Sequence, residues 1–469
     1  MLSLMIFLVG PGAESTFAQA APPSRDPDSF VNQQRASQER VRARLDQELI
    51  VPGKIAFDFG GWYSAYLFEF DDGVDSSRTL RRHDLRLWSR LVLDHGGSEF
   101  YVRGRLSLLD FNSGDSYDGN DDDIQGPNLE RGYYRFDLAK TFSAHNGPAI
   151  DGNVTFKAGR DLAQFGSGFA LAAPLDHVLL TLTCRDIELA FLAGKTVGSS
   201  EDFDVSRLAR RSHRDFWGVQ ATCRRLERHR PFAYALWQHD RNHEPTTTFG
   251  QRYDYDSFHA GVGSRGELVS RLYYTVECVY QTGHSFGANR FIHDSRIDAW
   301  GFDGRIEYLF PGRHRARASI EYIFGSGDPD RDLSPTGSTG GNEEGSTDSG
   351  FVAFGWRDTG LSFAPRYSNL HMWRVGGSLF PWPGHRRLDR FEIGTDWFLY
   401  YKHHRGAAVS DPTANVPSGY LGWEMDYFVN WEIASDLSWT ARCGIFMPGD
   451  AFGDRTTRTF VLTGIVWSF

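Results

Sequence analysis

The chain has 469 residues, a formal net charge of -10 and four widely separated cysteines, so nucleic acid, a disulfide framework and a cysteine metal site are all disfavoured. A soluble protein of this length would fold into two or three domains. Here strand-length segments recur almost throughout, and the 14% aromatic content is high for a mean hydropathy of -0.43. A membrane barrel, which shows aromatic side chains to lipid and polar ones to water, fits both facts.

The first 20 residues are predicted to be a signal peptide. Leu2–Val9 forms an apolar core and Ala18–Ala20 a small-x-small cleavage site, although the usual basic start is missing. Residues 21–53 are polar and are predicted to form a periplasmic segment. No other stretch approaches the roughly 18 apolar residues that a membrane helix requires.

Residues 54–469 consist of segments with alternating apolar and polar residues, separated by loops rich in Gly, Asp, Ser and Asn. In one of them Leu85 and Leu87 share one parity, while Arg86 and Arg90 take the other. Successive side chains of a strand point to opposite faces, so each such segment has one apolar and one polar side. The clearest examples are His83–Leu93, Phe100–Leu108, Arg315–Phe324 and Trp423–Trp431.

A soluble β-sandwich would show the same alternation, but two features favour a transmembrane antiparallel β-barrel. The apolar faces end in Trp and Tyr, as interfacial girdles require, and the segments are long enough to cross a bilayer when tilted. About 18 such segments fit between residue 54 and residue 469. The last, Thr459–Phe469, ends in an aromatic residue and resembles the signal that the barrel-assembly machinery recognises.

Two connections stand out by length and composition. Residues 110–125 are rich in Asp, and residues 325–350 are rich in Gly, Ser and Asp without apolar content. Barrels place long loops outside the cell, so we expect solvated external loops. The carboxylates of the first loop also suit a calcium site, although the spacing matches no EF-hand.

The polar faces are strongly basic. Arginine facing lipid costs roughly 2–4 kcal/mol at the bilayer midplane, so these side chains are predicted to line the lumen. There they would attract anions and bind carboxylates through paired hydrogen bonds. The residues concerned are Arg86, Arg90, Arg103, Arg105, Arg131, Arg135, Lys157, Arg315, Arg317 and Arg442, and Arg160 and Arg458 are expected to join them.

An alternative is that the arginines pair with lumenal acids and only fill the barrel. Candidate partners are Glu321, Glu392, Asp396, Glu424 and Asp426. An enzyme is not expected, because the sixteen histidines form no recognisable motif with Ser or Asp, and no cofactor is required.

Several stretches together resemble the alginate export porin family of outer-membrane barrels. They are Phe156–Gly166, Tyr322–Asp328, Asn369–Phe380, Leu421–Asp426 and Gly444–Phe452. The resemblance extends over about residues 54–469 and implies an 18-stranded barrel that exports a polyuronate through an arginine-rich constriction. It also implies that Arg160, Glu424 and Asp426 are lumen positions.

These observations predict a monomeric outer-membrane channel that exports an anionic, alginate-like polysaccharide. The expected partners are outer-membrane lipid, the barrel-assembly machinery and periplasmic export components. The closest alternative is an uptake porin for anions or sugar acids. A barrel enzyme, or an adhesive barrel plugged by residues 21–50, would be a different class of protein.

Overall fold

The structure is a computed structural model that describes residues 55–71, 77–115, 122–145, 147, 151–198, 212–241, 255–286, 294–331 and 346–469. The predicted signal peptide and the polar segment 21–53 lie outside these residues. So do parts of both long loops singled out above.

The described residues form 18 strands and two short helical turns, η1 (Asp94–Gly96) and α2 (Leu138–Ala144). The strands are β1 (Ile55–Phe70), β2 (Arg78–Leu93), β3 (Ser98–Phe111), β4 (Asp123–Asp137), β5 (Gly152–Phe165), β6 (Leu171–Cys184), β7 (Ile187–Thr196), β8 (Arg214–Cys223), β9 (His229–Asp240), β10 (Asp256–Val269), β11 (Leu272–Phe286), β12 (Asp294–Leu309), β13 (Arg317–Gly325), β14 (Leu370–Leu379), β15 (Phe391–Lys402), β16 (Tyr420–Glu432), β17 (Leu437–Pro448) and β18 (Arg458–Ser468).

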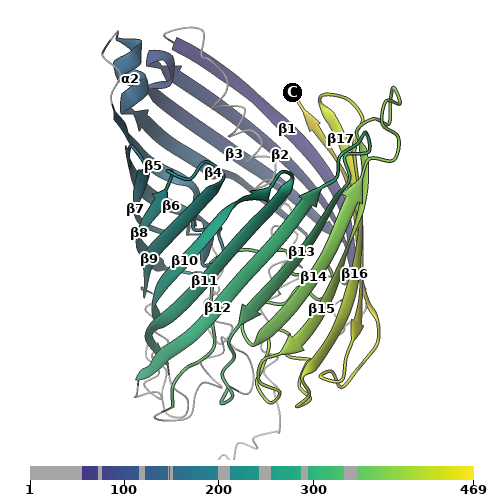
Figure 1. Cartoon of the computed structure of the whole chain (residues 1–469). Coiled ribbons are helices and arrows are strands. Elements are labelled where there is room, and N and C mark those ends of the chain that lie inside the picture. Colours follow the sequence, from purple (N-terminus) through teal and green to yellow (C-terminus); the bar gives the residue numbers. More distant parts are fainter. Residues whose placement is uncertain are drawn as a thin grey trace, which may run out of the picture.

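Each strand pairs antiparallel with its neighbours in sequence, and β1 also pairs with β18, so the sheet closes into a barrel. Figure 1 shows the tilted strands forming one continuous wall. The backbone of Phe469 exchanges hydrogen bonds with Gly61, which extends the seam to the last residue. The predicted 18-stranded antiparallel barrel is therefore confirmed. No helix in the described part is long and apolar enough to cross a membrane.

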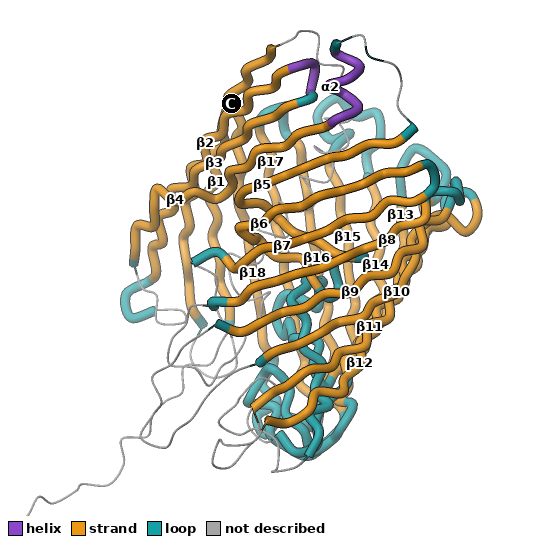
Figure 2. Tube along the Cα trace, turned by 90° about the vertical axis from the view of Figure 1, so that its left-hand side faces the viewer, coloured by secondary structure: helices purple, strands orange, loops and turns teal. Residues whose placement is uncertain are grey.

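Short turns collect at one end of the barrel, which we call the short-turn end. Residues 185–186 and 270–271 form two of these turns, and β1 begins and β18 finishes there. Helix α2 lies at the same end (Figure 1; Figure 2 gives a second view). The longer connections lie at the opposite end, and in outer-membrane barrels of known orientation the short turns are the periplasmic ones.

The outer surface of the barrel is apolar. Val375 in β14 is 55% exposed and Ile320 in β13 is 60% exposed, whereas the neighbouring Glu321 is buried on the inner side. Large exposed aromatic residues such as Trp217, Trp300 and Trp397 share this outer face. Because lipid covers such a surface, strand parity separates lipid from water around the whole ring.

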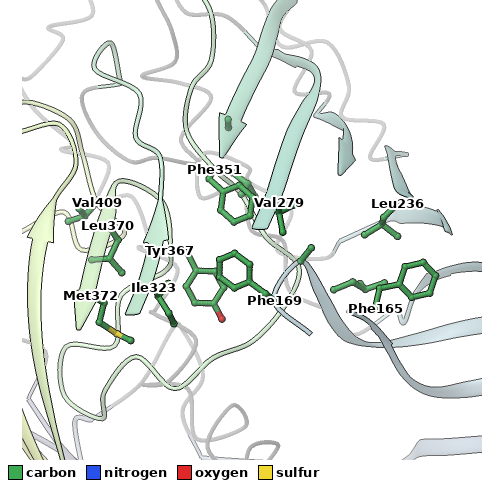
Figure 3. Close-up of a cluster of buried hydrophobic side chains, with 14 of the residues drawn as sticks. Phe165, Phe169, Leu236, Val279, Ile323, Phe351, Tyr367, Leu370, Met372 and Val409 are labelled. Carbon is green, nitrogen blue, oxygen red and sulfur yellow. The ribbon is translucent and has the colours of Figure 1, made fainter. Parts of the chain in front are cut away.

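The connection between β13 and β14 turns into the barrel instead of extending away from it. We call its described second part, residues 346–369, the inner loop. Phe351 and Tyr367 of this loop stack on either side of Phe169 from the β5–β6 connection, with ring centroids 5.5 and 5.1 Å apart (Figure 3). Residues 325–350 were expected to be an external loop, but Asp348 accepts a hydrogen bond from Ser285 of β11 and forms a β-bridge with Ile297 of β12, both buried on the inner side of the wall.

Placing a charge on the outer face should weaken the folded barrel. Val375→Arg puts a guanidinium group into lipid and should cost about 2–4 kcal/mol of folding free energy. Urea unfolding in lipid vesicles measures this difference. Val375→Leu, which keeps the position apolar, should unfold like the wild type. Equal stability of Val375→Arg and the wild type would contradict a lipid-facing position.

Candidate functional site

Strands β2–β5 carry a network of inward-facing charges that we call the basic wall. Each of its four carboxylates lies between two cations. Asp84 contacts Arg82 and Arg86, Glu130 contacts Arg86 and Arg103, Glu99 contacts Arg90 and Arg135, and Asp161 contacts Arg131 and Lys157. Among the described residues, seven cations thus share these four carboxylates, so the network itself carries more positive than negative charge.

The cations of the basic wall differ in their access to the lumen. The side chain of Arg86 is 0% exposed, and its Nη2 lies 3.1 Å from Asp84. The Arg135 side chain, near the short-turn end, is 35% exposed although it lies 2.7 Å from Glu99. Arg90, Arg131 and Lys157 are also partly exposed. Arg86 therefore braces the wall, while cations nearer the short-turn end can meet an anion in the lumen.

A β-bulge gives the basic wall two of its charges. The register between β3 and β4 shifts after Arg103, so Glu130 and Arg131 are adjacent in sequence yet both face inward. A bulge inserts one extra residue into a strand and re-aims its side chains. Glu130 then contacts Arg103 at 2.6 Å, and Arg131 contacts Asp161 at 3.0 Å.

Strands β11–β16, on the opposite side of the ring, carry the inward-facing acids. Buried carboxylates here are Glu277, Asp303, Glu321, Asp396, Glu424 and Asp426. Fewer cations accompany them. Arg374 serves two wall acids at once, with Nη1 3.2 Å from Glu321 and Nε 2.9 Å from Asp396, and it also reaches Asp358 of the inner loop at 3.4 Å.

The acids of this side bind the inner loop. Glu424 accepts hydrogen bonds from the backbone N–H groups of Leu361, Ser362 and Phe363 at 2.7, 2.5 and 2.9 Å. Asp426 accepts a fourth from Leu361 at 3.0 Å. Carboxylates bind backbone N–H groups strongly, and a loop that turns inside a barrel needs partners for those groups. Glu424 and Asp426, predicted to contact cargo, are buried beneath the loop they hold.

Two further ion pairs fix the inner loop. Arg357 lies 2.7 Å from Asp303 of β12 and also donates to Ser167, which in turn donates to Glu277 of β11. Arg331 contacts Asp348 at 2.6 Å. The polar contacts of the loop are therefore made to the acidic side of the lumen, while its Leu361 packs with Leu80 and Leu109, at the ends of β2 and β3 that lie away from the short-turn end.

Two predicted lumen residues lie elsewhere. Arg160 has the opposite parity from Lys157 and Asp161, and it pairs on the outer face with Asp176 of β6 at 2.7 Å. The prediction for Arg160 was wrong, because side chains an odd number of residues apart on a strand face opposite sides. The nearby Asp176 carboxylate lowers the cost of a charged side chain on the outer face. Arg315 lies in the short turn before β13, 3.7 Å from Asp389, because the strand begins at Arg317.

The remaining predicted residues face inward. Arg317 pairs with Glu392 at the short-turn end, at 3.1 Å. Arg442 of β17 lies over the Phe428 ring, 5.4 Å from its centroid. Arg105 shares the parity of Arg103 on β3. The acids Asp84, Glu99, Glu130 and Asp161 were missed in the sequence, where single acids within basic segments give little signal.

The comparison with family models decides the family. A model described as alginate export matches residues 202–462, more than half of the chain. The chain belongs to the alginate export family. The predicted resemblance is thereby confirmed. The matched region begins after β7, so the basic wall on β2–β5 lies outside it. No curated protein sequence matches the chain.

Solved barrels of Pseudomonas aeruginosa are similar to this member of the alginate export family in fold. OccK5 (OpdH) and OccK8 (OprE) each give a TM-score of 0.54, at 11% and 10% identity, covering 88% of this chain and 98% of theirs. OccK2 (OpdF), in a structure with glucuronate, gives 0.51 at 11% identity with the same coverage. Family and fold together support an outer-membrane channel. No metal-binding group of three or more His, Cys, Asp or Glu occurs among the described residues.

Removing the Glu424 anchor should loosen the inner loop. Glu424→Ala deletes three hydrogen bonds to a charged acceptor, each worth about 1.5–3 kcal/mol. We expect higher and noisier single-channel conductance in planar bilayers. Glu432→Ala, at the exposed end of the same strand, is the matched control and should leave conductance unchanged. An unaltered Glu424→Ala channel would show that the loop does not depend on this contact.

The Asp328 site should make attachment of the inner loop pH-dependent. Burial and the neighbouring Asp348 carboxylate raise the pKa of Asp328 to about 7, although Arg331 opposes them. A raised carboxyl pKa stabilises the folded state below the unfolded value of about 4, and this contribution is lost as the pH rises through 7.

Hydrogen exchange of residues 346–351, corrected for intrinsic rates, should therefore be on the order of tenfold faster at pH 8 than at pH 5.5. Asp328→Asn should abolish this difference. Asp454→Asn, an exposed aspartate in another loop, should retain it. Equal pH dependence in Asp328→Asn and the wild type would rule out Asp328 as the group responsible.

Proposed function

We propose that this channel exports an anionic polysaccharide of the alginate type, a polyuronate, by facilitated diffusion past the basic wall. The observation that carries the proposal is the sharing of four carboxylates among seven cations. Such a wall keeps a positive potential that attracts a polyanion, and the low-dielectric barrel concentrates the field. The family assignment supports the same cargo class.

Shared pairing also explains how the cargo would be released. Arg135 and Arg90 already contact Glu99, at 2.7 and 3.1 Å, so a uronate carboxylate competes with a partner that is always present. Each cation can exchange a wall carboxylate for a cargo carboxylate and back again. Binding stays moderate at every step, as conduction requires.

Three further proposals complete this function. We propose that residues 1–20 target the chain for secretion and that residues 21–53 lie in the periplasm. The partners would be outer-membrane lipid, the barrel-assembly machinery that selects the aromatic C-terminal strand, and periplasmic export components. The barrel would act as a monomer without a cofactor.

Uptake of small sugar acids is the second candidate function. It is favoured by the fold shared with OccK2, whose structure contains glucuronate. The two functions differ in their dependence on cargo length. An export channel should bind hexuronate oligomers more tightly as they lengthen, because successive carboxylates meet successive cations. An uptake porin should bind the monomer as well as the oligomer.

Neutralising the exposed cations should weaken polyuronate binding. In planar bilayers, the double variant Arg135→Gln, Lys157→Gln should lose anion selectivity. The oligouronate concentration that blocks half of the current should rise about tenfold, which corresponds to roughly 1.4 kcal/mol of binding free energy. Arg160→Gln is the matched control, because it removes a cation from the outer face of the same strand as Lys157. Cation selectivity of the wild type, or equal block of all three proteins, would refute the proposed function.

A further inference from the structure

A row of three aromatic rings crosses the basic wall on its inner side. Trp88 of β2, Tyr101 of β3 and Tyr133 of β4 share the inward parity of Arg86, Arg103 and Arg135. The Trp88 and Tyr101 centroids are 6.3 Å apart with planes at 15°, and those of Tyr101 and Tyr133 are 5.4 Å apart with planes at 20°. We call these three rings the aromatic row.

The aromatic row lies among the cations that the lumen can reach. Tyr101 is the cross-strand partner of the partly exposed Arg90, and Tyr133 is two residues from the more exposed Arg135, whereas Trp88 is the partner of the buried Arg103. All three rings are near the short-turn end, where β2 and β4 finish and β3 begins. Because strands of a barrel are tilted, a row that runs from strand to strand climbs the wall obliquely. A chain moving along the lumen would therefore pass the rings in succession.

Both ends of the aromatic row are held in place. A Cβ added at Gly60 would lie 3.1 Å from the Trp88 ring, so this ring covers the glycine on β1. The Tyr133 hydroxyl donates to Glu99 at 3.0 Å, and the Lys157 ammonium lies 4.7 Å from the centroid of the Tyr133 ring. These contacts fix the orientation of the Trp88 and Tyr133 rings before any ligand binds. Such preorganisation lowers the entropy cost of binding.

The aromatic row faces the lumen, whereas its neighbours in sequence face lipid. Phe100 and Tyr134, the sequence neighbours of Tyr101 and Tyr133, face outward and pack on each other at 4.8 Å, where lipid covers them. The three rings of the row are only half-buried, on a wall that faces water and carries charge. A site for an amphipathic ligand accounts for apolar rings and accessible cations on one surface.

We propose that the aromatic row binds the pyranose rings of the polyuronate while the neighbouring arginines bind its carboxylates. The proposal rests on the proposed function and identifies which part of the cargo is recognised. One face of a sugar ring presents C–H groups with partial positive charge, and the face of an aromatic ring is negative. The carboxylate of the same hexuronate would reach Arg90 or Arg135. The wall thereby distinguishes a sugar polyacid from other polyanions.

The test compares two probes of equal charge in planar bilayers, oligogalacturonate and oligo-L-glutamate with the same number of carboxylates. The double variant Trp88→Leu, Tyr101→Leu removes two rings and leaves every cation in place. Phe100→Leu, Tyr134→Leu is the matched control, because it removes two outward rings from β3 and β4. Heat-modifiability on gels verifies folding, and Tyr101→Leu alone serves if the double variant does not fold.

Removing the rings should raise the half-blocking concentration of oligogalacturonate by about three- to tenfold per ring. Block by oligoglutamate and the reversal potential in a salt gradient should stay unchanged. Trp88→Phe, Tyr101→Phe should retain most of the oligogalacturonate block. If block by both probes falls equally, or if neither changes, the aromatic row does not recognise sugar. A wild-type channel that oligogalacturonate fails to block would instead refute the proposed function.

Discussion

The whole structure depends on the need to satisfy every backbone polar group inside a hydrocarbon layer. Eighteen antiparallel strands meet this need by pairing in a ring, and the seam between β1 and β18 extends to the backbone of Phe469. Once the ring is closed, alternate side chains must face either lipid or the lumen. The charged residues of the strands are thereby concentrated in a narrow interior, where their arrangement determines what can pass.

The two sides of the lumen use charge differently. On β11–β16, carboxylates hold the backbone of the inner loop and its Arg357, so much of the acidic charge is engaged in positioning that loop. On β2–β5, the four carboxylates of the network contact the wall's own seven cations instead of the inner loop, so the described network carries more positive than negative charge. The loop is therefore bonded to the side that would repel a polyanion, while the cations of the basic wall nearest the short-turn end, such as Arg135 and Lys157, stay partly exposed.

Strand parity made the barrel predictable from sequence, because Leu85 and Leu87 alternate with Arg86 and Arg90 over a full strand. At Arg160 the lumen expectation followed the family resemblance, whereas parity counted from Lys157 places this residue on the outer face, where it pairs with Asp176 of the next strand. The bulge that turns Glu130 inward leaves no periodic signal, since it breaks the period. The role of Glu424 was also hidden, because its partners are backbone groups 61–63 residues away in sequence.

The shared carboxylates of the basic wall give this lumen an economical way to change its character during evolution. Because Glu99 serves both Arg90 and Arg135, replacing that one acid would release two guanidinium groups at once. Conversely, one new acid placed between two arginines would contact both and lower their net charge by one. Homologous barrels could thus be retuned for cargoes of different charge density by single substitutions, while the strand framework and the inward-folded segment stay as they are.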